Sequence, residues 1–134
     1  MEFRKENERF VIKFDCGEKI IASLSKFLER TQIKGGFFFG IGAISGVEFK
    51  SFSLKTKKYR SMKKKGELEI VSLSGIISEL GAHAHICVAD EKGKCFGGHL
   101  NEATVSVTAE IILTEMKKIR RKYDKKTGLN LLEL

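Results

Sequence analysis

Apolar and polar residues follow two different periods in the first third of this chain. Residues 9–15 alternate, which is the pattern of a β-strand with one buried face. Asp15 and Glu18 fit a capping box, and this predicts that a helix begins just after the strand. The apolar face of the helix is formed by residues at helical spacing: Ile20, Ile21, Leu24, Phe27 and Leu28. We expect Gly35 and Gly36 to end the helix.

The rest of the chain predicts mostly β-structure. We expect further strands at residues 37–45, 47–54, 67–74, 82–89, 94–100 and 104–113. The last of these alternates most clearly and has one apolar side: Val105, Val107, Ala109, Ile111 and Leu113. One helix on many short strands is typical of the α+β class. We therefore predict a single domain, residues 1–134, built as a mainly antiparallel β-sheet with one main flanking helix.

Two glycine-rich or apolar segments need separate interpretation. The run from Gly40 to Gly46 follows a helix and does not open one, so we interpret it as tight packing or a bend in the sheet and not as a phosphate-binding loop. Residues 120–134 are basic and then apolar. We expect this tail to dock on its own core or on a neighbouring subunit.

Composition adds limits on the class of protein. The chain has 134 residues, of which 42% are hydrophobic and 31% charged, and this excludes a disordered chain. The longest weakly polar run is too short to span a bilayer, and no apolar signal segment follows the charged N-terminus. We therefore expect a cytoplasmic protein with no membrane partner. Its three cysteines, Cys16, Cys87 and Cys95, predict buried, reduced thiols.

Charge is concentrated in one basic segment. The net charge is +8, and residues 50–65 carry eight cations and no acidic residue. The candidate nucleic-acid contacts are Lys55, Lys57, Lys58, Arg60, Lys63, Lys64 and Lys65, with Lys50 at the start of the segment. A phosphate-binding ribbon for DNA and a solvated hairpin fit this pattern equally well. Tyr59 alone is aromatic within the dense part, which argues against base stacking.

All three histidines lie within twenty residues of one another. His83 and His85 are two apart on a predicted strand and share a face. A three-residue turn, Glu91-Lys92-Gly93, would pair Asp90 with Lys94 and place His85 directly opposite His99. Opposed Cβ atoms are about 5 Å apart and diagonal ones about 7 to 8 Å, so the three imidazoles can converge on one ion.

We therefore predict a site for Zn²⁺, or another divalent transition metal, held by His83, His85 and His99. The alternative is that all three are ordinary polar residues of a half-buried strand, and a bulge at Gly97-Gly98 would shift the register by one residue. Cys87 shares the face one pair further along and is a weaker candidate for a fourth ligand.

Several motifs together resemble the PPC domain, the plant and prokaryote conserved domain. They are Ser72-Leu73-Ser74-Gly75, His83-Ala84-His85 and Gly97-Gly98-His99-Leu100, with Gly40-Ile41-Gly42-Ala43 before them and Tyr123-Asp124-Lys125-Lys126-Thr127-Gly128-Leu129 after them. The resemblance covers essentially the whole chain. It implies a PPC-like antiparallel sheet with flanking helices, a homotrimer, and metal binding by the three histidines. The plant members carry an AT-hook with an Arg-Gly-Arg-Pro core, which a chain without proline lacks.

Three functions remain open at this point. The first is a metal-containing trimeric PPC protein that acts as a DNA-binding or regulatory module. The second is a zinc-dependent enzyme that acts on a small molecule through metal-bound water, with Glu79, Glu102 or Glu110 as the available base. The third is a metal site that only stiffens the fold.

Overall fold

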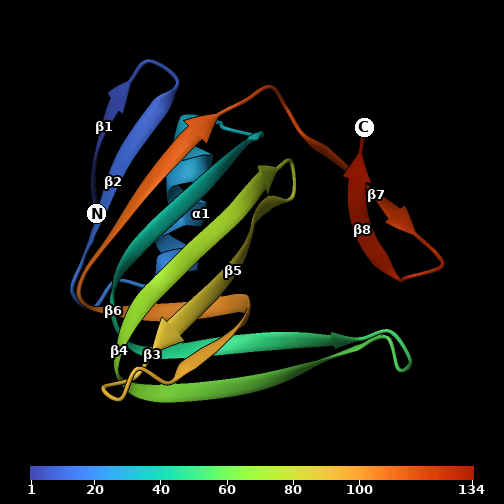
Figure 1. Cartoon of the computed structure of the whole chain (residues 1–134). Coiled ribbons are helices and arrows are strands. Elements are labelled where there is room, and N and C mark those ends of the chain that lie inside the picture. Colours follow the sequence, from blue (N-terminus) through green and yellow to red (C-terminus); the bar gives the residue numbers. More distant parts are fainter.

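The computed structural model describes all 134 residues, which form one helix and eight strands joined by turns and loops (Figure 1). In chain order these are β1 (Glu2–Glu6), β2 (Arg9–Asp15), α1 (Ile20–Thr31), β3 (Gly36–Ser53), β4 (Lys58–Ser78), β5 (Gly81–Ala89), β6 (Cys95–Glu115), β7 (Arg120–Asp124) and β8 (Leu129–Glu133). The prediction of a mainly antiparallel sheet with one helix is confirmed. The helix is too short and too polar to cross a membrane, and the chain has no other.

Six strands form one antiparallel sheet in the order β1-β2-β6-β3-β4-β5. The long strand β6 also pairs with β5, so that β6, β3, β4 and β5 form a closed ring of paired strands. Helix α1 lies behind this sheet in Figure 1, and its face of Ile20, Leu24, Phe27 and Leu28 is buried in the core. Burial of these large apolar side chains contributes about 1.5–3 kcal/mol each before the entropy cost of ordering them.

The helix begins later than predicted. Glu18 accepts a hydrogen bond from the Asp15 amide at 2.8 Å, which is one arm of the expected capping box, but the helix starts at Ile20 and Lys19 gives no side-chain cap. The predicted end is also wrong, because the helix stops at Thr31 and Gln32 turns left-handed at φ 58°. Gly35 instead allows a close approach, since a side chain there would collide with the Lys117 carbonyl.

Two long strands, β3 and β6, each join two predicted strands. β3 runs through both 37–45 and 47–54, with register shifts near Gly42 and Gly46, so the glycines mark bends as expected. β6 likewise runs through 94–100 and 104–113. Its register against β3 shifts between Val105 and Ala109, and Val107 is therefore left 69% exposed, contrary to the predicted apolar side.

Three further features correct the sequence reading. β1, which pairs with β2, was not predicted. All three thiols are free, but Cys16 and Cys95 are exposed and not buried. The tail forms a separate β7-β8 hairpin that stands away from the main sheet in Figure 1. None of its residues belongs to the buried core, and Leu131 and Leu132 are exposed, so of the two expected docking places the core is not filled by the tail.

Candidate metal centre

The three histidines meet on one face of the β5-β6 hairpin. His83 and His85 project from β5, and His85 pairs directly with His99 of β6, as the turn length predicts. The turn closes with the Asp90 amide bonded to the Lys94 carbonyl at 3.1 Å, and Gly93 is left-handed at φ 73°. The register runs without a shift from His85 to Ala89, so Gly97-Gly98 carries no bulge.

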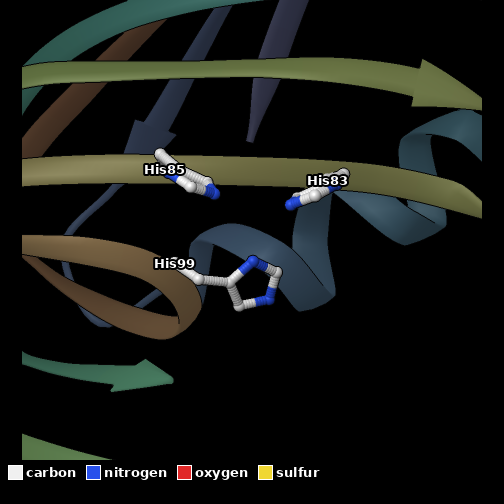
Figure 2. Close-up of side chains that lie close together, drawn as sticks. All are labelled: His83, His85 and His99. Carbon is white, nitrogen blue, oxygen red and sulfur yellow. The ribbon is translucent and has the colours of Figure 1, made fainter. Parts of the chain in front are cut away.

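The rings are close enough to act as one donor set. One ligand atom of each histidine lies within 4.8 Å of the others, and the ring centroids are 4.9 to 5.6 Å apart. Figure 2 shows the three side chains directed toward one space beside the hairpin. Nitrogens that share one zinc at about 2 Å lie about 3.3 Å from one another, so a small rotation of the rings completes a site. The donor set fits zinc or a similar ion.

Burial favours the uncharged form of two of these rings. It lowers the pKa of His83 below its ordinary value, and the nearby His99 and Arg121 lower it further. It also lowers the pKa of His99, with His85 and Lys50 adding to the effect. The neutral imidazole, which is the form that binds a metal, is therefore favoured at neutral pH.

Residues 50–65, at the end of β3 and the start of β4, form an arm, hereafter the basic arm. A hollow beside the triad is lined on one side by this arm. The hollow has a volume of about 690 Å³ and reaches from the histidines to Phe49, Phe52, Tyr59 and Leu129. The Tyr59 ring lies 6.2 Å from the His99 ring and 4.9 Å from the Phe52 ring. Lys57 at the tip of the arm donates to the Lys125 carbonyl at 3.2 Å, which joins the arm to the β7-β8 hairpin.

None of the three candidate carboxylates joins the histidines. Glu79 is bound to Lys118 at 2.8 Å and to the Arg121 amide at 3.2 Å. Glu102 accepts from the amides of Ile21 at 2.8 Å and Ala22 at 3.2 Å, so it caps α1 from β6. Glu110 is exposed on β6 opposite Lys13. Cys87 faces Gly97 and also lies outside the group.

The structure brings other residues to the triad that the sequence reasoning missed. Lys50 pairs with His99 across β3 and β6, and Arg121 and Tyr59 line hollows that touch the histidines. The sequence pattern places Lys50 only in the basic segment. Its position next to His99 depends on the long-range register of β3 against β6, which no local pattern encodes.

The cations of the basic arm are exposed except for Lys50 and Lys64, which are half-buried. Lys64 has its Nζ 4.3 Å from the Phe96 ring centroid, and Lys63 lies 3.9 Å from Glu48. The others, Lys55, Lys58, Arg60 and Lys65, make no ion pair within the chain. The arm therefore presents an extended positive surface with one acidic neighbour.

Residues 1–117 match the family model of the Plants and Prokaryotes Conserved (PCC) domain, and the chain belongs to this family, the PPC domain. Solved structures agree. A protein described as a putative DNA-binding protein, from Bacteroides thetaiotaomicron, is 27% identical, with a TM-score of 0.95 over 98% of this chain and 96% of its own. A PPC protein of Pyrococcus horikoshii is 31% identical, with a TM-score of 0.85 over 99% and 94%. The metal-containing protein AF0104 of Archaeoglobus fulgidus is 27% identical, with a TM-score of 0.85 over 100% and 99%.

A curated relative is much longer than this chain. The bifunctional protein GlmU of Synechococcus sp. (strain JA-3-3Ab) is 31% identical over 116 residues, which are 84% of this chain but only 18% of the relative. The similarity therefore concerns one part of that protein.

Proposed function

We propose that this chain is a metal-binding PPC-domain protein in which His83, His85 and His99 hold a divalent transition metal, zinc or a similar ion. The observation that carries the proposal is the convergence of three imidazole nitrogens within 4.8 Å on a hairpin whose register is fixed by its turn. The metal-containing relative from Archaeoglobus fulgidus supports it. An ion held there would supply Lewis-acid chemistry at the mouth of the hollow.

The stability of the folded chain tests this proposal. A ligand that binds only the native state raises its stability in proportion to the logarithm of ligand concentration over Kd. Zinc added to chelator-treated protein should therefore raise the Tm, and a chelator should reverse the rise. A Tm that does not respond to zinc contradicts the site.

A second function, DNA association, is supported by the basic arm. Most of its cations face solvent on a hairpin that projects from the sheet (Figure 1), and the similar protein from Bacteroides thetaiotaomicron is described as a putative DNA-binding protein. Lysines contact phosphates as point charges, so the interaction we propose is insensitive to DNA sequence and sensitive to salt.

We also propose a homotrimer, which the family resemblance implies. An apolar stripe on the sheet face opposite α1 supports self-association: Phe37, Phe39 and Ile41 of β3 are 43%, 55% and 59% exposed. Ile76 of β4 pairs with Phe37 and extends the stripe. The β7-β8 hairpin lines a hollow with part of this stripe but leaves its side chains partly exposed, and a second copy would remove them from water.

The enzyme alternative has one supporting feature and one against it. The hollow beside the triad could admit a small molecule. No aspartate or glutamate lines it, however, so a carboxylate base for water activation is missing. The geometry therefore supports metal and ligand binding better than hydrolysis.

A further inference from the structure

The charged side chains that line the hollows around the triad are all positive. Three hollows touch the histidines, and none of them is lined by an acidic residue. The first contains Lys50 and Arg60, and the other two share Arg121. Every ionisable side chain that faces the site, apart from the histidines themselves and Tyr59, is therefore a cation.

The two cations that act on the pKa values of the histidines lie in different elements. Lys50 is directly opposite His99 in the pairing of β3 with β6. Arg121, on β7, lines one hollow with His83 and His85 and another with His83 and His99. Its guanidinium donates one bond, from Nη1 to the Asn130 carbonyl at 3.0 Å, and the other donors of its fork make no hydrogen bond within the chain.

No acidic side chain that lines the hollows balances the positive charge at this place. Three neutral imidazoles leave a bound divalent ion with its full charge of about +2, and Lys50 and Arg121 add to it. The acids nearby are bound to other groups. Glu48, which also feels Lys50, accepts from Ser61 and lies 3.9 Å from Lys63, while Glu79 is paired with Lys118 and Glu102 accepts from the amides of α1. A negatively charged ligand would relieve this accumulation, and a three-histidine site leaves a coordination position for it.

Lys50 and Arg121 line separate hollows that share histidines of the triad, so the two cations flank it. We propose that they form an anion-binding subsite beside the triad, which takes the carboxylate of a small organic molecule. This inference rests on the proposed metal site. The walls of the hollow that Lys50 lines favour an organic anion over an inorganic one, because Phe52 and Tyr59 offer aromatic surface to the body of the ligand. The guanidinium fork of Arg121 matches a carboxylate in geometry.

Cobalt-loaded protein tests the subsite by direct binding. Co²⁺ replaces zinc in such donor sets and, unlike Zn²⁺, gives a visible spectrum that reports its ligands. Titration with benzoate should change this spectrum and saturate. Acetate should bind more weakly because it lacks the apolar body, and inorganic phosphate more weakly still.

Two variants and a matched control assign the effect to the named cations. Arg121→Gln and Lys50→Gln should each weaken benzoate binding about tenfold or more, the loss of a charge-assisted hydrogen bond, while each keeps the cobalt stoichiometry. Lys122→Gln, a neighbouring exposed residue of β7 that lines none of the hollows, removes the same charge and should leave affinity unchanged.

The outcomes separate this proposal from the metal site. Cobalt-loaded protein whose spectrum ignores saturating benzoate overturns the subsite alone. So does benzoate affinity that both variants leave unchanged, or phosphate binding stronger than benzoate. A chain that takes up no cobalt contradicts the metal site, and the subsite with it.

Discussion

The positions of the three histidines follow from local features of the β5-β6 hairpin. The two-residue period of β5 puts His83 and His85 on one face, and the turn at Gly93 brings His99 opposite His85. Gly97 allows the strands to approach, since a Cβ there would lie 2.9 Å from the Ile86 carbonyl. These causes are local, and for this reason the sequence alone could predict the triad.

Glu102 illustrates a residue whose role is set by the fold and not by its neighbours in sequence. Its carboxylate accepts from two amides of the first turn of α1, where no residue of the helix itself provides a cap. Replacement by alanine should lower the free energy of unfolding by about 1 kcal/mol, the usual cost of a lost helix cap. Urea denaturation measures the change.

Glu110→Ala is the matched control for this substitution. The residue is exposed on the same strand and its side chain makes no hydrogen bond or ion pair in the chain, so the change should stay within about 0.5 kcal/mol. Equal stability of the two variants would show that Glu102 does not cap the helix.

At the scale of elements, short-range patterns predicted where strands lie but not how far they run. Alternation is interrupted in β3 near Gly42 and in β6 between Val105 and Ala109, because register shifts bend both strands there. The sequence pattern therefore predicts two strands in each case, since a bend in a strand changes which residues face the core. The β1 strand was missed because its burial is slight, with most of its residues exposed.

The basic arm yields a prediction about salt. Lys57, Lys58, Lys63, Lys64 and Lys65 should be replaced together by glutamine. If the arm contacts DNA phosphates, the slope of log K against log salt should flatten by about 0.9 for each lost contact. Fluorescence anisotropy with a DNA duplex at several salt concentrations measures the slope, and metal content should not change.

The control for the arm removes the same charge elsewhere. Five exposed lysines outside the arm are suitable: Lys26, Lys34, Lys92, Lys117 and Lys122. Their replacement by glutamine should leave the slope nearer to that of the unmodified chain. If both sets of changes have the same effect, or the unmodified chain binds no DNA at low salt, the arm is a solvated surface.

At the scale of the whole molecule, the site depends on three separate parts of the chain. The β5-β6 hairpin supplies the histidines, the basic arm covers one side, and the β7-β8 hairpin brings Arg121. The sequence predicted the first part in register and the second as a charged segment. It could not predict that the arm and the tail face the same hollow, because that depends on contacts between distant segments, such as Lys57 with the Lys125 carbonyl.

The proposed trimer gives a prediction about assembly. Light scattering at micromolar concentration should give three times the chain mass of 15.1 kDa. Phe39→Glu places a charge in the middle of the apolar stripe, where burial against another copy would desolvate it, and should give smaller species. Leu54→Glu changes an apolar residue of the arm that is 66% exposed, against 55% for Phe39, and should leave the mass unchanged. A monomer mass for the unmodified chain contradicts the trimer.

Elemental analysis of zinc-equilibrated, desalted protein tests most directly whether His83, His85 and His99 hold one metal ion. The unmodified chain should retain about one ion per chain. Cys87→Ala, on the same face but outside the triad, should retain as much. The double variant His85→Ala, His99→Ala should retain almost none, because one imidazole cannot hold the ion through desalting. Full occupancy in the double variant, or an empty unmodified chain, would contradict the account.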